Sequence, residues 1–552
     1  MRKFSLLGGA VGVLALSACG DLLEVQNFNN PDVARAYSTV DGVEGVVAGL
    51  ASGLYNGGGQ RGNEGANTQS KILSGESMTS VNNFGGAPRS AIPRTPISNS
   101  LGNDIETGNR VDFERFSVLS RTAANAIAAV ERLAAPPGVG LGSVGRTQRA
   151  RAFGYFVLGQ ALGNLAAAYD SAAIVTPDVG ASDIPGLSAY GVVNAAAIRM
   201  LDSAEAATIA GAAGAADFAL PATWLSSTGW SQPNFLRLVR SVRTRIMTGA
   251  ARNPTEAAAI DWAKVINDGE TNGITADFTN DVGGTTGWTC GYHCIQSYVQ
   301  STWAWAPMYY YGMADTSGAY STWLATPRST RTQFLVQTPD TRWPQGATRA
   351  AQQAEAPAAT GTRLPTGRYM RNRPTGDDPP AEGWGQSMYD HRRWGFIREN
   401  SNTGTMVEMD FNEPRLLAAE GLIRTGQFAR AAALINQTRT AFGLPAITAF
   451  DGTSPVPGGT ACVPRVPTGP NFTSATCGNM LEAMKYELRM ETAWTGYMEW
   501  FRHHRRWGDM IEGTPLEWPV PYQEMQARRQ VFYDGTMVAP TGTYRFGTGA
   551  DR

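Results

Sequence analysis

Hydrophobic positions recur with a helical period through much of the chain, most clearly between residues 411 and 445. A segment from 411 to 424 precedes Thr425 and Gly426, and apolar side chains then return at i, i+3, i+4, i+7 and i+14, namely Phe428, Ala431, Ala432, Ile435 and Phe442. This spacing places them on one face of a helix that ends at Gly443 and Pro445. The pattern predicts an antiparallel helical hairpin with close packing at its alanines, as in tetratricopeptide-type repeats, although the full repeat signature is absent.

The same period marks several other regions. The earlier ones are residues 116 to 133 with 147 to 169, 190 to 210 with 233 to 252, and 255 to 268. A later helix is predicted from Asn479 to about Arg506, with an apolar face of Leu481, Met484 and Leu488 that is thickened by Trp494, Tyr497, Trp500 and Phe501. Residues 518 to 521 are predicted to be extended, because two of them are prolines.

We therefore expect a mostly α-helical fold in one body, residues 19 to 552, with a tetratricopeptide-like scaffold over about 34 to 268, 408 to 445 and 479 to 510. Between residues 269 and 407 the chain is rich in Gly, Thr, Pro and aromatic residues and has little helical period. Long irregular stretches of this kind usually carry function, so we expect an inserted loop-rich lobe there. A second irregular stretch, about 446 to 478, is predicted to be an excursion from the scaffold.

The N-terminus predicts export. Arg2 and Lys3 precede a short apolar run that ends in Leu-Ser-Ala-Cys at residues 16 to 19, which is typical of a lipoprotein signal peptide. Residues 1 to 18 would be removed, and Cys19 would carry lipid chains such as palmitate. The alternative is an ordinary cleaved signal with an incidental cysteine. No later stretch is apolar enough to span a bilayer, so the lipid is the expected membrane contact.

The net charge and the spacing of the cysteines indicate which ligands, disulfides and metal sites the protein can have. The formal net charge is −1, so there is no basic surface of the kind that nucleic acids require. The four remaining cysteines form two local pairs, and in an oxidising envelope they predict disulfides joining Cys290 to Cys294 and Cys462 to Cys477. A metal site at Cys290, His293 and Cys294 is the alternative, but structural zinc needs four converging ligands, so we predict none.

Two segments are candidates for ligand binding. The first is an aromatic cluster of seven residues, Trp303, Trp305, Tyr309, Tyr310, Tyr311, Tyr320 and Trp323. Sugar rings pack their C–H faces on aromatic rings, and peptides use the same surfaces, whereas the alternative is that these rings fill the core of the lobe. The second is a polar loop with Asn82, Asn83 and Phe84, for which a simple turn is the alternative.

No catalytic arrangement stands out in the sequence. Glu487 and Glu491 lie four residues apart and could imitate an acid and base pair, but the neighbouring cations Lys485, Arg489, Arg502 and Arg505 favour structural ion pairs. His503 and His504 are adjacent, so their side chains point in different directions on a helix and do not predict a histidine metal centre. The sequence contains no phosphate loop, dinucleotide fingerprint or EF-hand loop, and we expect no cofactor.

Several short motifs together carry a family resemblance. They are Glu413, Arg415 and residues 418 to 422, then Ala432, Ile435, Asn436 and Arg439, then residues 487 to 489, Glu491 and Gly496, and finally Pro519, Val520, Pro521 and Glu524. With the lipoprotein N-terminus and the Arg- and Ala-rich segment from 149 to 168, their order resembles the SusD/RagB family of outer-membrane nutrient-uptake lipoproteins. Thr495, Met498, Phe501, Gln526 and Ala527 depart from the family pattern and indicate a divergent member.

This resemblance implies a helical body of four tetratricopeptide-like hairpins that supports an irregular ligand-binding lobe. It also implies a lipid-anchored protein of the cell outer membrane, facing the exterior, that captures an oligosaccharide or peptide and delivers it to a TonB-dependent outer-membrane barrel without catalysis. Two other functions remain open: an envelope hydrolase such as a glycosidase, with two carboxylates in the lobe, and a helical-repeat adaptor without a small ligand.

Overall fold

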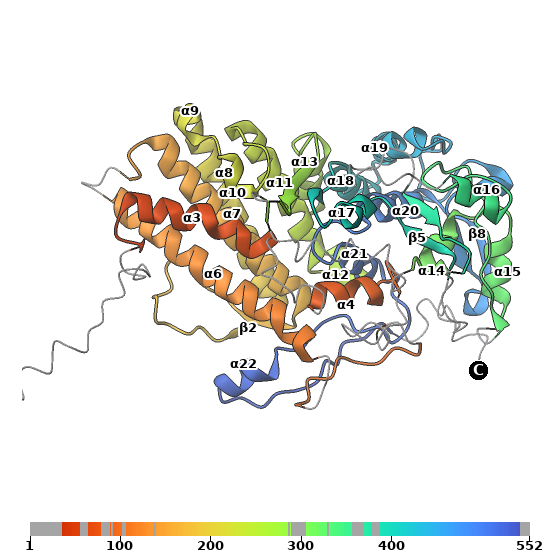
Figure 1. Ribbon diagram of the computed structural model, residues 1–552, viewed down its shortest axis with the longest axis horizontal. Helices are drawn as coiled ribbons and strands as arrows, with labels where there is room; N and C mark the ends of the chain where they lie inside the picture. The colour runs from red at the N-terminus through yellow and green to blue at the C-terminus, as the bar shows by residue number, and fades with distance from the viewer. Residues whose placement is uncertain are drawn as a thin grey trace, which may run out of the picture.

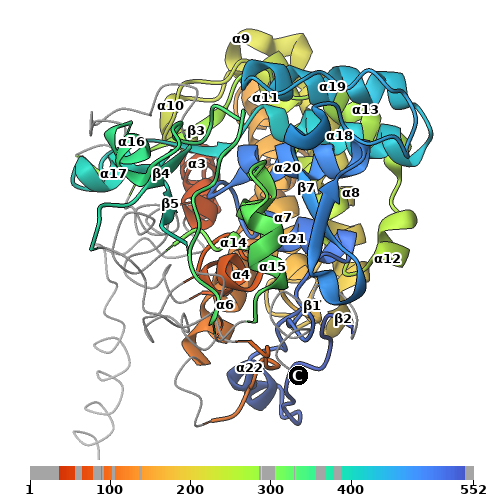
Figure 2. The same ribbon diagram turned by 90° about the vertical axis from the view of Figure 1, so that its right-hand side faces the viewer.

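Helices form one elongated body in the computed structural model of this chain (Figure 1). The structure describes residues 36–540, apart from the internal segments 56–64, 79–88, 90–91, 102–105, 136–139, 285–286, 289–304, 328–329, 356–368 and 377–386. The N-terminal helices lie at one end, and an irregular lobe lies at the other. In Figure 2 the lobe faces the viewer, with helix α15 and strand β7 in front.

The scaffold is a continuous row of helices, each packed against the next. In order along this row they are α3 (Val40–Tyr55), α6 (Glu106–Ala134), α7 (Val144–Ala168), α8 (Tyr190–Ala210), α11 (Gln232–Gly249), α13 (Trp262–Glu270), α18 (Asn412–Arg424) and α19 (Phe428–Ala441). The helical periodicity found along the sequence therefore corresponds to real helices, and α8 has the predicted bounds. The predicted hairpin of α18 and α19 is also confirmed.

Helix α7 is buried on almost every side because glycines let three neighbours approach it. A methyl group built on Gly154 would lie 2.7 Å from an isoleucine of α6, one on Gly159 2.7 Å from a leucine of α8, and one on Gly163 2.5 Å from an isoleucine of α11. Side chains of the neighbouring helices therefore occupy the positions where α7 has none. Such interdigitation gives the close packing expected of a protein core.

Two helices predicted as continuous are broken in the structure. The predicted helix from 255 to 268 is split into α12 (Pro254–Ala258) and α13, because the Asp261 side chain accepts a hydrogen bond from the Lys264 amide and caps a new helix. The predicted helix from 479 to 506 is split into α20 (Met480–Thr492) and α21 (Glu499–Trp507), so that prediction was wrong.

Contacts with the N-terminal part of the chain explain the break between α20 and α21. Trp494, Gly496 and Met498 all have positive φ angles. The Met498 amide donates to Asn67 Oδ1 at 2.8 Å, and the Trp494 amide donates to the carboxylate of Glu76. These bonds tie the turn to α4 (Ala66–Leu73) and to the residues just after it. Tertiary contacts outweigh the helical period here.

The remaining helices are short. They are α9 (Ala215–Phe218), α10 (Ala222–Leu225), α14 (Met308–Tyr311), α15 (Ala319–Ala325), α16 (Arg349–Ala354), α17 (Gly395–Glu399) and α22 (Tyr522–Ala527), with 3-10 turns at Gly211–Gly214, Gly312–Ala314, Gly459–Ala461 and Pro470–Phe472. Helices α14 to α17 belong to the predicted lobe, which is therefore not wholly irregular.

The strands of the described residues form four small antiparallel pairs. These pairs are β1 (Ser171–Ala173) with β2 (Leu187–Ala189), β3 (Phe278–Val282) with β6 (Gly404–Met409), β4 (Met370–Asn372) with β5 (Tyr389–His391), and β7 (Arg465–Thr468) with β8 (Ser474–Cys477). The predicted disulfide between Cys462 and Cys477 is confirmed and closes the β7–β8 hairpin. Residues 518 to 521 are extended, as predicted, and Trp518 forms a parallel β-bridge with Tyr169 at the end of α7.

Candidate functional site

The predicted aromatic cluster does not form a surface. Trp305, Tyr309, Tyr310, Tyr311, Tyr320 and Trp323 are each at most 4% exposed, and all but Trp305 belong to the hydrophobic core of the lobe. The rings of these five pack on one another or on α21, with ring centroids 5.1 Å apart for Tyr311 and Trp500 and 5.7 Å apart for Tyr309 and Trp323. The Trp305 ring packs against Arg373. These six residues cannot stack on a ligand while buried, so the expectation that they bind one is corrected.

The hydroxyl groups explain why such polar rings are stable inside the lobe. Tyr310 Oη donates to the Asp509 carbonyl at 2.6 Å, and Tyr311 Oη donates to the Glu76 carbonyl at 3.1 Å. Buried hydroxyls need partners of this kind. The other sequence candidates, Cys19, Asn82, Asn83, Phe84, Cys290, Cys294 and Trp303, lie outside the described residues.

Glu487 and Glu491 form ion pairs inside the molecule. Arg342 Nη1 donates to Glu487 Oε2 at 2.9 Å and to Glu491 Oε1 at 3.0 Å, while its Nε and Nη2 bind Asp340. All four side chains are at most 2% exposed. The predicted ion pairs are confirmed, but the partner is an arginine of the lobe and not one of the cations near them in sequence.

Burial also changes the proton affinity of these groups. It raises the pKa of Glu491 to about 7, an effect that the neighbouring Asp410 increases and that Arg393 and Arg342 oppose. Burial lowers the pKa of His503 and of His504 well below the usual value, and nearby arginines act in the same direction. These side chains are in the core, where a substrate has no access, so their shifts reflect structure and not catalysis.

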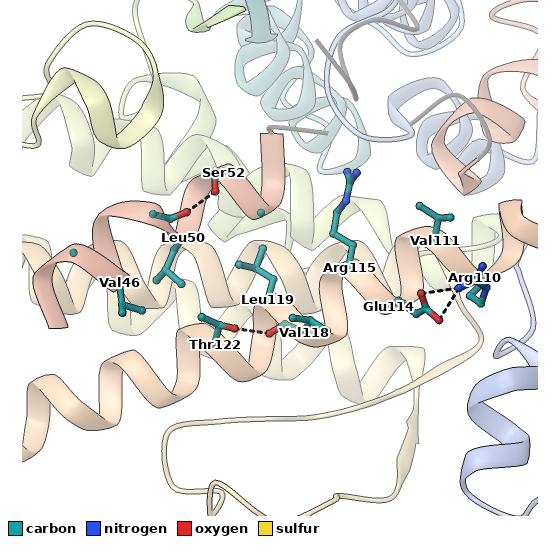
Figure 3. Close-up of a pocket in the computed structure, with 13 residues that line it drawn as sticks. Val46, Leu50, Ser52, Arg110, Val111, Glu114, Arg115, Val118, Leu119 and Thr122 are labelled. Carbon is teal, nitrogen blue, oxygen red and sulfur yellow. Dashed lines mark hydrogen bonds and ion pairs between the residues drawn. The ribbon is translucent and has the colours of Figure 1, made fainter. Parts of the chain in front are cut away.

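A groove of about 710 Å³ runs between α3 and α6 (Figure 3). Gly45, Gly49 and Gly53 follow one another on α3 at intervals of four residues, and a methyl group built on Gly45 or Gly49 would meet nothing within 4 Å. The missing side chains leave the groove open. Its other wall is α6, with Val111, Val118 and Leu119 among the lining residues.

The polar groups of this groove are mostly satisfied by their own helices. Ser52 Oγ donates to the Gly49 carbonyl at 2.7 Å, Thr122 Oγ1 donates to the Val118 carbonyl at 2.9 Å, and Arg110 pairs with Glu114. None of the described residues that line the groove is aromatic. It therefore suits the apolar side chains of a protein or peptide better than sugar rings.

A second pocket, of about 460 Å³, lies between α8, α12 and α13. Its floor includes Met247 and Ile198, and its rim carries Glu256, Asp202 and Lys264. Glu256 is already bound by the Tyr190 hydroxyl at 2.8 Å and by the Asn253 amide at 2.7 Å, and Asp202 pairs with Lys264 at 3.3 Å. These charged groups are thus paired within the protein, and they offer a ligand little unpaired charge.

No family model matches the sequence, and no curated protein matches it. Solved structures do match. A SusD-like protein from Bacteroides fragilis superposes with a TM-score of 0.53 at 13% sequence identity, covering 91% of this chain and 98% of that chain.

The chain has the SusD-like fold.

Two other solved structures are similar at lower TM-scores. One is a SusD superfamily protein from Bacteroides thetaiotaomicron, with a TM-score of 0.48 and 13% identity over 90% of this chain and 97% of that chain. The other, described as a laminarin-binding SusD-like protein, has a TM-score of 0.45 and 13% identity over 89% of this chain and 98% of that chain. The assignment of the SusD-like fold rests on the Bacteroides fragilis structure.

The described residues of this SusD-like fold include neither a membrane-spanning helix nor a metal-binding cluster. None of its helices is long and apolar enough to cross a membrane. No three His, Cys, Asp or Glu side chains within the described part of the chain gather closely enough to hold a metal ion. The groove between α3 and α6 and the pocket between α8, α12 and α13 were both missed by the sequence reasoning, although the spacing of Gly45, Gly49 and Gly53 was a visible signal of an open helix face.

Proposed function

We propose that this protein is an outer-membrane lipoprotein that binds an oligomeric nutrient, with a glycan as the preferred ligand, and delivers it to a partner TonB-dependent transporter. The observation that carries the proposal is the structural likeness to a SusD-like protein over 91% of this chain and 98% of that chain. The lipoprotein signal ending at Cys19 supports the location, because a lipid on this residue would tether the body to the membrane.

The chemistry of the described residues supports binding without catalysis. A glycosidase needs two carboxyl groups that flank the scissile bond in an accessible site. Glu487 and Glu491, the pair suggested by the sequence, are buried in the core, where each accepts a hydrogen bond from Arg342. A hydrolase reading would therefore need another pair of carboxylates.

The groove between α3 and α6 supports a second candidate, a helical-repeat adaptor. Its described lining residues are largely apolar and include no aromatic side chain, which suits a protein partner. In the adaptor reading, partner binding would be independent of any glycan.

Affinity purification of the tagged, lipidated protein from detergent-solubilised outer membranes tests the proposal. We expect a large TonB-dependent barrel in near-equal amount by mass spectrometry, and binding of the purified protein to at least one oligosaccharide on a glycan array. Cys19→Ala is the control, and it should leave the membrane fraction. A protein that recovers another partner and binds no glycan would support the adaptor instead, and turnover of a bound glycan would support the hydrolase.

A further inference from the structure

A small pocket at the junction of the scaffold and the lobe is built from three separate segments. They are the loop at residues 228–230, the beginning of α11, and residues 274–277, which lead from α13 into β3. The pocket volume is about 160 Å³. Figure 2 shows α10, which precedes the loop, beside β3, and Asn280 Nδ2 donates to the Leu225 carbonyl at 2.7 Å across this contact.

Each wall of the pocket is held in place by bonds to its surroundings. Trp230 exchanges two backbone hydrogen bonds with Leu220, at 2.8 and 3.0 Å, and its ring meets Phe278 edge to face at 5.7 Å. Arg237 Nη1 donates to two carbonyls, those of Thr271 and Gly273, both at 3.0 Å. The pocket is therefore preformed, and a ligand would not have to order its walls.

The third wall is fixed in the same way. The Ile274 amide donates to Ser241 Oγ of α11 at 2.8 Å, and Asp277 Oδ1 accepts from the Phe411 amide at 3.1 Å. Residues 274 to 277 are thus tied both to α11 and to the residue that precedes α18. The carboxylate of Asp277 and the guanidinium of Arg237 both line the pocket, so their charges balance there.

The side chains in this pocket match the surface of a sugar ring. Trp230 is partly exposed and lines the pocket, while its Nε1 is buried, so the indole offers carbon surface for C–H groups. The Asn234 side chain is exposed, and it forms no hydrogen bond with any described residue. Its amide can both donate to and accept from a hydroxyl. Thr228 and Thr275 add exposed hydroxyls.

The volume and the charge of the pocket indicate which class of ligand it can bind. A volume of about 160 Å³ suits one ring rather than an oligomer or a helix. The balance of one cation and one anion gives no preference for a charged ligand, whereas an aromatic ring beside amide, guanidinium, carboxylate and hydroxyl groups suits a polyhydroxylated ring. A nucleotide or an anion would need an excess of positive charge.

We propose that this pocket, which we call the Trp230 pocket and define by Trp230, Asn234, Arg237, Thr275 and Asp277, binds one neutral sugar unit. The inference deepens the proposed function and rests on it, because the unit would belong to the carried glycan. The Trp230 pocket would hold one residue of the chain at the edge of the scaffold. It is separate from the aromatic core of the lobe, where the rings of Tyr309, Tyr310, Tyr311, Tyr320 and Trp323 are buried.

Saturation-transfer NMR on the full lipidated protein in detergent tests the inference directly. The probes are D-glucose, D-galactose, D-mannose, D-xylose and N-acetyl-D-glucosamine, each added alone. Thr275→Trp places a large side chain in the pocket from an exposed position, and Thr476→Trp, on the exposed side of β8, is the matched control. Asn234→Ala removes one amide from the rim. Circular dichroism checks that all three variants keep the helical content of the wild type.

We expect at least one monosaccharide to receive saturation from the wild type and from Thr476→Trp, and none from Thr275→Trp. Asn234→Ala should weaken binding about fivefold, which corresponds to one neutral hydrogen bond. The proposal is overturned if no probe receives saturation from the wild type, or if Thr275→Trp behaves like the wild type.

The glycan array separates this inference from the proposed function. If the wild type and Thr275→Trp bind the same array glycans with equal affinity, the Trp230 pocket is excluded and the proposed function stands. If the pocket binds a monosaccharide but the protein recovers no transporter from membranes, the delivery role fails and the pocket remains supported.

Discussion

Removing the cation at Arg342 should destabilise the protein strongly. Arg342 is fully buried and donates hydrogen bonds of 2.8 to 3.1 Å to three carboxylates, those of Asp340, Glu487 and Glu491. Arg342→Met keeps most of the side-chain volume but leaves these acids without their shared partner. Breaking a buried ion pair on one side typically costs about 3–5 kcal/mol, because an uncompensated charge remains in the core. We expect a loss of this size in the free energy of unfolding.

Urea unfolding followed by tryptophan fluorescence measures this loss. Arg110→Met is the matched control, since the Arg110–Glu114 pair is on the surface of one helix, and its removal should cost about 0.5 kcal/mol or less. The double variant Arg342→Met with Glu487→Gln should lose less than the sum of the two single changes. If Arg342→Met matched the control within about 1 kcal/mol, the charges of this cluster would not be coupled as described.

Three further outcomes are expected. Gly163→Ala should destabilise the protein, because the new methyl group would lie 2.5 Å from an α11 side chain. Gly49→Ala should instead stabilise the protein by about 0.5–1 kcal/mol, because its methyl group would meet nothing within 4 Å. Equal effects of the two variants on thermal unfolding would contradict both packing arguments. Glu491 has a pKa of about 7 in the folded state, above its value in the unfolded chain, so its contribution to the free energy of unfolding is lost as the pH rises toward 7. Relative to the wild type, Glu491→Gln should therefore become more stable between about pH 5 and pH 8. A stability difference that does not change with pH would contradict this prediction. Cys462→Ser opens a disulfide that spans 15 residues and should cost about 3 kcal/mol, seen as faster proteolysis near the β7–β8 hairpin than in the oxidised wild type; unchanged cleavage there would show that the disulfide adds little.

Helix positions could be predicted from the sequence because their signals are local. The period of apolar residues located α8 to the residue, and the alanines of α18 and α19 indicated their close pairing. The break between α20 and α21 had no such signal. It depends on Glu76 and Asn67, which lie more than 400 residues earlier in the chain.

The candidate ligand sites were harder to predict. A dense run of aromatic residues has the same sequence pattern whether it lines a surface or fills a core, and only the packing of the Tyr311 ring against Trp500 of α21 settles the question for this cluster. The Trp230 pocket joins residues 228 to 277 across several elements. Residues 226 to 229, just before Trp230, are two serines, a threonine and a glycine, which indicate a loop but give no sign that Arg237 and Asp277 lie near it.

The contacts of the α20–α21 turn also constrain how the protein can be produced. The amides of Trp494 and Met498 bind side chains that lie 418 and 431 residues earlier. In the proposed function the chain is exported N-terminus first, so α4 would reach the envelope long before these partners. Contacts this distant in sequence form slowly. We therefore expect α4 and the residues just after it to lack these partners until nearly the whole polypeptide has been exported, and holding chaperones would be most needed during that interval.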